Sequence, residues 1–559
     1  MTDTAAELTG ASGTKGLKGG ALGLVSSVVV GMSSTAPAYS LAASLGFVVA
    51  IVGVKAPSIM LLAFVPMYLI ALSYQELNKA EPDCGTTFTW ATRAFGPWAG
   101  WMGGWGIIAA DVIVMANLAQ IAGSYSYKLV GADGLAASTL WSTVAGIIWI
   151  VIMTYICYRG IEVSARIQYV LLSIELAVLA VFAVVAIVKV GTGHGVAGSI
   201  HPSLSWLWPG GLSLTSLVQA TLIAVFLYWG WDTAVACNEE TKDPEKTPGR
   251  AAILSTVLLL ATYALVTVAA VSFAGVGTKG IGLGNADNSD DVFAALGPAV
   301  FGNSGLGTVF KVLLIISVLT SASASTQTTI LPTARTTLSM AAYRAIPVSF
   351  ARIHPRYLTP TVSTVWMGGA SIVFYVLLTG LSQNILGDSI AAVGLMIAFY
   401  YGMTGFACAW YYRHELTHSV RSLFMRGILP ALGGVMLLGA FVRSSIDYAD
   451  PGYGNTTILG IGGVFVVGIG GLLLGAILMV VYSRVAPPFF RNQTLVRGSS
   501  DLLLAGTGRM PTLGLPDSGT QAIVVPPPVL SGDDPAPAAP GDFGATDQKP
   551  RPDPHRTAP

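Results

Sequence analysis

The chain has 559 residues, of which 53% are hydrophobic and only 10% are charged, and its formal net charge is +1. Soluble globular domains carry about 25% charged residues, so this composition excludes an ordinary soluble protein and indicates an all-α polytopic membrane protein. The near-zero charge gives no indication of a nucleic-acid partner. The four cysteines form no CxxC pair, so neither a disulfide framework nor a metal site is predicted.

The two ends of the chain differ in composition from its middle. Residues 1–19 are polar and small and end without a small-residue cleavage site, so we expect an N-terminal cytoplasmic tail rather than a signal peptide. Residues 485–559 are rich in Pro, Gly, Asp and Ser, which is typical of a disordered tail. The apolar residues 20–484 are predicted to form the membrane domain.

Twelve apolar segments follow one another in this domain, each long enough for a bilayer, which takes about 20 residues. They lie near residues 21–46, 56–75, 98–127, 137–158, 166–190, 213–240, 250–275, 306–331, 361–380, 389–412, 427–444 and 457–483. Lys and Arg gather in the loops on one side, which include Arg335 and Arg344 after the eighth segment. Basic loops stay in the cytoplasm, so both termini are expected on the cytoplasmic side of a plasma membrane.

The first segment is interrupted by residues 31–40, GMSSTAPAYS. We expect unwound backbone at Ser33, Ser34, Thr35 and Ala36, whose freed N–H groups at the start of the second half-helix would suit a substrate carboxylate. The alternative is a kink at Pro37 whose freed carbonyls are satisfied by the hydroxyls of Ser33 and Ser34.

Two later segments each carry a lone acid, and an ionisable residue within a span indicates a functional site. Asp111, in the third segment, is predicted to pair with the amino group of a substrate; the alternative is a structural hydrogen bond to a neighbouring helix. Glu175, in the fifth segment, is predicted to load and release a proton, because burial disfavours the charged form of a carboxyl group. Its alternatives are a hydrogen bond to hydroxyls of the eighth segment and coordination of Na+.

The sixth segment is broken at Gly230, with Tyr228, Trp229 and Trp231 around the break and Asp232 after it. The aromatic residues are predicted to wall a substrate and hold an ammonium group, or else to serve as packing. Asp232 is predicted to bind substrate or, as the favoured reading, to cap the second half-helix. Glu239 and Glu240, at the end of this segment, either contact a loop Arg as a gate or form a solvated helix end.

The eighth segment contains the hydroxyl-rich run SASASTQTT. Ser321 and Ser325 lie on one helical face and are expected, as their main role, to permit close helix packing. The broken first and sixth segments each open a block of five. Matching breaks of this kind predict an inverted repeat over residues 20–190 and 213–412, with two further helices in residues 427–483.

Three further motifs accompany the broken first segment: FLYWGWDTAVACNEETKDPEKTPGRAA, SYQELNKAEPDCGTTFTWATRAFGP and ARTTLSMAAYRAIPVSFARIHPRYLTP. With them the chain resembles the amino acid–polyamine–organocation (APC) permease superfamily. The resemblance implies a leucine-transporter-like fold of ten helices in an inverted repeat plus two, with substrate between the broken helices. In this fold the eighth helix faces the first near an ion site, so the resemblance also implies that the hydroxyls of Ser321 and Ser325 could coordinate a cation. Ser33–Ser34–Thr35 departs from the Gly-Ser-Gly-like turn of many members, and Glu175 stands where several have a Lys in place of a sodium ion.

These observations predict a secondary-active importer of an amino acid, coupled to H+ or, alternatively, to Na+. The other readings are an amine or polyamine permease, an exchanger, and a non-coupled channel or sensor. No HExxH motif, Walker motif or Ser/His/Asp set at membrane depth occurs, so an enzyme is not predicted. The expected partners are a small molecule, the coupling ion and the lipid bilayer, with no cofactor, metal or nucleic acid.

Overall fold

The computed structural model describes residues 15–289, 291–302, 304–381, 385–454 and 456–495. They belong to the first of the two units into which the chain divides, Met1–Leu513. Most of the two predicted tails, residues 1–14 and 496–559, lies outside the described residues.

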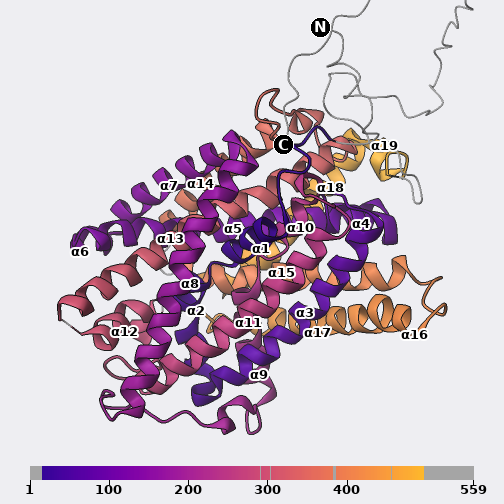
Figure 1. Ribbon diagram of the computed structural model, residues 1–559. Coiled ribbons are helices and arrows are strands. Elements are labelled where there is room, and N and C mark those ends of the chain that lie inside the picture. The colour runs from indigo at the N-terminus through magenta and orange to yellow at the C-terminus, as the bar shows by residue number, and fades with distance from the viewer. Residues whose placement is uncertain (1–14, 290, 303, 382–384, 455, 496–559) are drawn as a thin grey trace, which may run out of the picture. The chain divides into compact units, whose positions relative to one another are not determined.

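The described chain is almost entirely helical (Figure 1). Its first half forms α1 (Leu24–Thr35), α2 (Pro37–Val52), α3 (Ala56–Ala80), α4 (Thr87–Phe95), α5 (Pro97–Leu129), α6 (Asp133–Ala136), α7 (Thr139–Arg159) and α8 (Ile161–Gly191). The middle forms α9 (Leu214–Tyr228), α10 (Thr233–Ala236), the 3-10 turn η4 (Asn238–Glu240), α11 (Thr247–Ala274), α12 (Val292–Phe301) and α13 (Gly305–Ala342). The remainder forms α14 (Thr361–Leu381), α15 (Ile385–Tyr411), α16 (Val420–Ser422), the π-helical turn η7 (Leu423–Ile428), α17 (Leu429–Tyr448), the strand pair β1 (Thr457–Ile458) and β2 (Ile461–Gly462), α18 (Gly463–Val485) and α19 (Pro487–Phe490).

Ten helical stretches among the described residues are long and apolar enough to cross a membrane. One of them, Leu24–Ala80, contains α1, α2 and α3, while α9 is shorter and apolar. The structure therefore confirms a multi-pass membrane protein. The count of twelve spans stays a prediction. It is reached by counting α1–α2 and α3 as two spans and by adding α9–α10 as another. The inverted repeat also stays a prediction.

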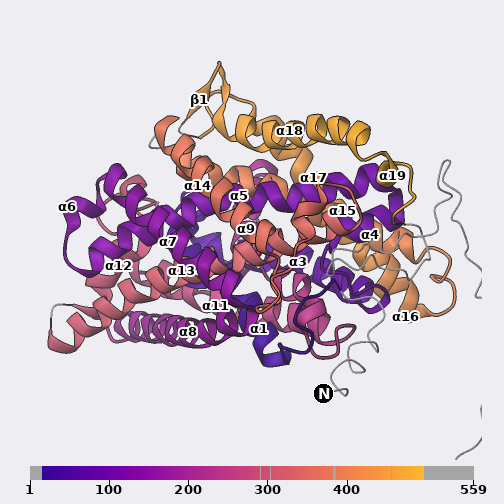
Figure 2. The ribbon, with the colours of Figure 1, turned by 90° about the horizontal axis from the view of Figure 1, so that it is seen from above.

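The two predicted breaks in the chain lie against each other. The first separates α1 from α2 at Ala36, and the second separates α9 from α10 at Gly230. α1 contacts α10, and α2 contacts α9, so each half-helix of one broken span meets a half-helix of the other. α8, α11 and α13 pack around them, and α5 packs on α13 with α7 and α14 on its outer side (Figures 1 and 2).

α13 is longer than the predicted eighth span, because its helix continues beyond residue 331 to Ala342. The sequence placed Arg335 in a basic loop, and that placement is wrong. Arg335 lies inside α13 and is fully buried, so it is not part of the basic loop that sets the orientation. Its charge is balanced by an acid on a distant segment, which a reading of local composition does not detect.

Both ends of the described chain pack onto the membrane domain. Residues 15–22 run along η4, where Leu22 pairs with Thr241 as an isolated bridge. At the other end the sequence placed the start of a disordered tail at residue 485, whereas α19 is buried against α4 and α5. The ordered chain therefore extends on both sides into the segments predicted as tails.

Candidate functional site

The first break is narrower than the sequence suggested. α1 continues through Ser33, Ser34 and Thr35, and only Ala36 leaves the helix, with a left-handed φ of 47°. The following Pro37 explains this, since a proline disfavours helical backbone at the one residue before it. The N–H of Ala36 donates to the carbonyl of Ser33 at 3.2 Å, so the expected run of unwound backbone is reduced to one residue.

The N–H groups at the start of α2 already have protein partners. The N–H of Ala38 donates to Oε1 of Glu175 at 2.7 Å, and the N–H of Tyr39 donates to Oγ of Ser321 at 3.1 Å. Pro37 has no N–H to offer. The positive end of this half-helix is therefore occupied by side chains of α8 and α13 rather than open to a ligand.

Glu175 joins three helices at this point. Its Oε1 accepts hydrogen bonds from Ala38 of α2 and, at 2.8 Å, from the hydroxyl of Ser321 on α13. The side chain is fully buried, and its Oε2 has no hydrogen-bond partner among the described residues. The contact with Ser321 is the one that the sequence weighed as an alternative to proton transfer. The unpartnered oxygen leaves room for a proton or a cation as well.

Ser325, one turn after Ser321, is used differently. Its hydroxyl donates to the carbonyl of Ser34 at 2.8 Å, and the hydroxyl of Ser34 lies 2.8 Å from that of Thr233 on α10. These bonds tie α1 to α13 and α10 around the break. Ser325 therefore satisfies a carbonyl at the break, a role that the alternative reading of the sequence gave to Ser33 and Ser34. Ser33 Oγ itself has no partner in the described part of the chain.

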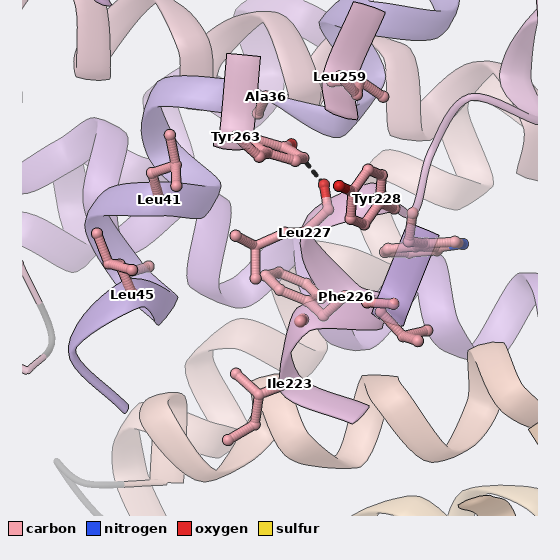
Figure 3. Packing of buried hydrophobic residues seen from close by; sticks show 14 of the residues in the cluster. Ala36, Leu41, Leu45, Ile223, Phe226, Leu227, Tyr228, Leu259 and Tyr263 are labelled. Atoms are coloured by element: carbon pink, nitrogen blue, oxygen red, sulfur yellow. Dashed lines mark hydrogen bonds between the residues drawn. The ribbon is translucent and has the colours of Figure 1, made fainter. Parts of the chain in front are cut away.

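The end of α9 is held by tyrosine hydroxyls. Tyr263 of α11 donates to the carbonyl of Leu227, in the last turn of α9 (Figure 3). Tyr228 donates to the carbonyl of Met60 at 3.1 Å and packs edge-on against the Tyr263 ring. Tyr228 therefore supports the broken helix from the side of α3 and α11.

Asp232 does not cap α10, contrary to the favoured reading of the sequence. Asp232 stands at the N-cap position of α10, but its backbone is helical (φ −65°, ψ −18°), whereas capping residues typically have extended backbone, and its side chain makes no capping hydrogen bond. Instead its carboxylate accepts a hydrogen bond from the hydroxyl of Tyr400 at 3.1 Å. The same hydroxyl accepts from the indole N–H of Trp229, so Trp229, Tyr400 and Asp232 form a chain of hydrogen bonds.

Trp231 lies in a cluster of buried aromatic rings. Its ring centroid is 5.1 Å from that of Tyr74 and 5.2 Å from that of Tyr401. Its indole N–H has no hydrogen-bond partner among the described residues, although the side chain is fully buried. A buried donor without a partner is costly, so it marks a place where a ligand or water completes the site.

Asp111 is buried on α5, with 3% of its surface exposed, and accepts a hydrogen bond from the hydroxyl of Thr333 on α13. This is the bond to a neighbouring helix that the sequence offered as an alternative. Asp111 nevertheless also lies within electrostatic reach of Asp232 and of the hydroxyls of Tyr74 and Tyr400. The structure thus brings both acids to the same aromatic cluster.

A family model described as amino acid permease matches residues 27–424. The chain belongs to the amino acid permease family. The match covers both breaks and every predicted site residue, and it confirms the resemblance to the APC superfamily and a transporter rather than an enzyme.

Individual relatives of this permease are distant. An uncharacterized transporter of Mycobacterium tuberculosis is 26% identical over 356 residues, which is 61% of this chain and 70% of that protein. A low-affinity putrescine importer of Escherichia coli is 22% identical over 430 residues, 76% of this chain and 88% of the importer. A branched-chain amino acid permease of Lactococcus lactis is 27% identical over 224 residues, 37% of this chain and 46% of the permease.

Beyond the broken helices, the permease has a buried ion pair. Arg335 of α13 donates from Nε to Oε2 of Glu240 at 2.6 Å and from a terminal nitrogen to Oε1 at 2.9 Å. Both side chains are almost fully buried. Of the two sequence readings of Glu240, contact with an Arg is therefore correct and a solvated helix end is wrong; the Arg lies on a helix and not in a loop.

The N-terminal segment closes the same region of the permease. The ammonium of Lys15, fully buried, lies 2.8 Å from Asp83 Oδ2 and 2.5 Å from Glu239 Oε1, beside the thiol of Cys84. Burial alone would raise the pKa of Asp83, but the Lys15 ammonium and hydrogen bonds from Gly85 and neighbouring hydroxyls hold that pKa at about 2. Asp83, Cys84 and Glu239 have the ligand types of a metal site, and here the ammonium of Lys15 lies among them.

Sequence reasoning missed Tyr74, Thr333, Tyr400 and Lys15 as members of these clusters. Tyr400 and Tyr401 were visible as a paired aromatic run, FYYG, in the predicted tenth span. This pair of tyrosines in the middle of a predicted span was the signal that the sequence offered for the cluster. A pair of tyrosines does not indicate which distant acid its hydroxyls will contact.

Proposed function

We propose that this permease is a secondary-active importer of a small solute bearing an amino group, an amino acid or an amine, and that H+ is its coupling ion. The solute is bound between the two breaks, with Asp111, Trp229, Trp231 and Asp232 around it. The permease lies in the plasma membrane with both termini in the cytoplasm, and its two five-helix halves form an inverted repeat.

The observation that carries the coupling proposal is the position of Glu175. A single buried carboxyl group contacts α2, which begins directly after the first break, and α13, which packs against both α1 and α2. When the carboxylate is charged, its Oε1 accepts from Ala38 and Ser321. A proton on the unpartnered Oε2 would turn that oxygen into a donor and weaken the two bonds that Oε1 accepts, because a neutral carboxyl group is a poorer acceptor than a carboxylate. Protonation therefore changes the contacts between α2, α8 and α13. A change of this kind can drive a shift between two conformations.

The rival coupling ion is Na+, which the Glu175 carboxylate and the Ser321 hydroxyl could coordinate. The proton is preferred because the described side chains at Glu175 contribute one carboxylate and one hydroxyl, while hard cations take six or more oxygen ligands in many protein sites. An exchanger that uses no ion is the other alternative.

The test is uptake by purified permease in proteoliposomes with pH and sodium gradients imposed separately. We expect accumulation driven by the pH gradient and no response to sodium. Glu175→Gln should lose proton-driven accumulation by at least about 10-fold while retaining exchange of labelled for unlabelled solute. Glu162→Gln, the same change at an exposed position of α8, is the matched control and should behave as the wild type. Sodium-driven accumulation, or an unaltered proton response in Glu175→Gln, would contradict the proposal.

A further inference from the structure

Resting on the function proposed above, we infer that the solute is an organic amine without a carboxylate group, with its ammonium held between Asp111 and Asp232. The sequence alone favoured an amino acid. Three features of the site separate the two classes of solute: the donors at the first break, the charges at the second break and the rings between them.

The first feature is that the first break offers no free donors to a carboxylate. The N–H groups of Ala38 and Tyr39 already bind Glu175 and Ser321, that of Ala36 binds a carbonyl, and Pro37 has none. A carboxylate taken out of water needs several hydrogen bonds to offset its desolvation. A substrate carboxylate at the start of α2 would have to displace Glu175, which already supplies an acid at that place.

The second feature is that the site contains two carboxylates without a basic partner. Asp111 and Asp232 are 3% and 6% exposed, and neither belongs to an ion pair among the residues that the structure describes. The donors around them are neutral: the hydroxyl of Thr333 for Asp111, and for Asp232 the hydroxyl of Tyr400, with the Tyr401 hydroxyl and nearby backbone N–H groups. A buried acid is normally either paired with a cation or neutralised by a proton. A solute that brings a cation can take the place of protons on two acids of this kind, and one ammonium group has three donors to share between them.

The third feature is the wall of rings next to both acids. Tyr74, Trp231 and Tyr401 lie in mutual contact, with centroid distances of 5.1, 5.2 and 5.7 Å. Aromatic faces attract ammonium groups, most strongly where water is excluded. The unpartnered indole N–H of Trp231 is a single donor on the residue next to Asp232. It suits a neutral oxygen or a water molecule better than a carboxylate, which would face the Asp232 charge.

Together these features assign opposite preferences to the two ends of an amino acid. The site accommodates its ammonium group and disfavours its carboxylate. A decarboxylated amine keeps the ammonium group that the site accommodates and lacks the carboxylate that it disfavours. A diamine can place its second ammonium group near the same acids. The solute class is therefore that of primary monoamines and diamines.

The test uses matched pairs that differ only in the carboxylate: ornithine and putrescine, lysine and cadaverine, leucine and isopentylamine. Each is offered as a competitor in exchange assays with proteoliposomes, without an imposed gradient, and as a ligand in thermal-shift measurements on the purified permease. We expect each amine to compete at a concentration at least about 10-fold lower than its parent amino acid. A parent amino acid that competes as well as its amine, or better, would overturn the inference.

The exchange format separates this inference from the coupling proposal. Exchange of amines without proton-driven accumulation would contradict the coupling and support the solute class. Proton-driven accumulation of amino acids would support the coupling and contradict the solute class. If no solute of the panel is bound or exchanged, both the amine class inferred here and the amino-group solute of the proposed function are overturned.

Variants locate the ammonium group. Asp111→Asn and Asp232→Asn keep the size of each side chain and remove its charge, and each should weaken amine binding at least about 10-fold. An amino acid should lose much less, because the same change that weakens the hold on its ammonium group also removes a charge that repels its carboxylate. Asp133→Asn, at an exposed position on α6, is the matched control and should have no effect. Equal losses for amines and amino acids, together with a lower melting temperature, would show a structural role for the acids and overturn the assignment. The matched pairs on the wild type remain decisive if a variant does not fold.

Discussion

Gly230 is the residue at which the two breaks touch. Its φ is +119°, which residues with a side chain rarely adopt, and a Cβ placed on it would lie 2.7 Å from the carbonyl carbon of Ser34 and 2.9 Å from the nitrogen of Thr35. The close approach of the backbone of α1 to that of the second break therefore depends on the absence of a side chain at one position.

We expect Gly230→Leu, and even Gly230→Ala, to abolish uptake while the protein still inserts into the membrane. Strained backbone of this kind costs about 1–3 kcal/mol, and the clash with Ser34 pushes the two breaks apart. Uptake and the amount of membrane-inserted protein are the measurements. Gly211→Ala is the control, because Gly211 also has a positive φ, 89°, but no atom lies within 4 Å of its added Cβ. Normal transport by Gly230→Leu would disprove the two-break model.

At the scale of elements, charged contacts join segments that lie far apart in the sequence at one end of the broken spans. Lys15 links the N-terminal segment to Asp83, between α3 and α4, and to Glu239 in η4. Asp83 also accepts hydrogen bonds from Ser339 and Tyr343. Ser339 lies on α13, one turn after the buried Arg335, and Tyr343 directly follows the end of that helix. These are elements that have to separate if the permease opens on this side.

We expect Lys15→Met to loosen this end of the permease. Removing one partner of a buried ion pair leaves an unpaired charge and costs about 3–5 kcal/mol. Cys84 is buried beside Lys15, so a water-soluble thiol reagent should label it at least about 10-fold faster in the variant. Lys18→Met, which removes an exposed pair with Glu162, is the control and should label as the wild type does. Unchanged labelling of Cys84 would mean that Lys15 does not hold this end closed.

The pH dependence of the Lys15 contact follows from Asp83. Its folded-state pKa, about 2, is below the usual value of about 3.9, so its contribution to stability is fully present above the unfolded pKa and is lost as the pH falls through about 2. The rate of Cys84 labelling in the wild type should therefore not rise between pH 7 and pH 5. The rate is first corrected for the pH dependence of the reagent itself, which is measured on a free thiol. A rise over that interval would contradict an ionised Asp83.

At the scale of the molecule, the family match ends at residue 424, while the described chain continues through α17, α18 and α19. α19 contributes two buried rings, with Phe489 stacked 5.4 Å from Phe88 and Phe490 4.9 Å from Trp98. The hydroxyl of Thr494 donates to the carbonyl of Tyr343. The start of the C-terminal segment is therefore part of the packed protein.

Two truncations test the prediction that residues after the described segment form a disordered tail. Removing residues 496–559 should leave the melting temperature of the purified permease nearly unchanged. Removing residues 486–559 should lower it clearly, because losing a buried Phe side chain costs about 3–5 kcal/mol. Equal melting temperatures for the two truncated proteins would show that the rings of α19 contribute nothing.

The sequence by itself determined the membrane class, the family resemblance, and the positions of both breaks. These depend on local chemistry: apolar runs of sufficient length, a proline that disrupts the helix before it, and a glycine that permits φ of +119°. It also singled out Glu175, Asp111 and Asp232, because acids within apolar segments are conspicuous.

Tertiary structure alone decided what each of these acids contacts. Glu175 and Ser321 fill the donors of α2, Asp232 meets Tyr400 instead of capping α10, and Arg335 and Lys15 are buried against acids distant in the chain. The contacts that Glu175 and Ser321 make with the N–H groups of α2 join residues that are 137 and 282 positions apart in the chain. No local sequence pattern encodes which distant helix will supply such a partner.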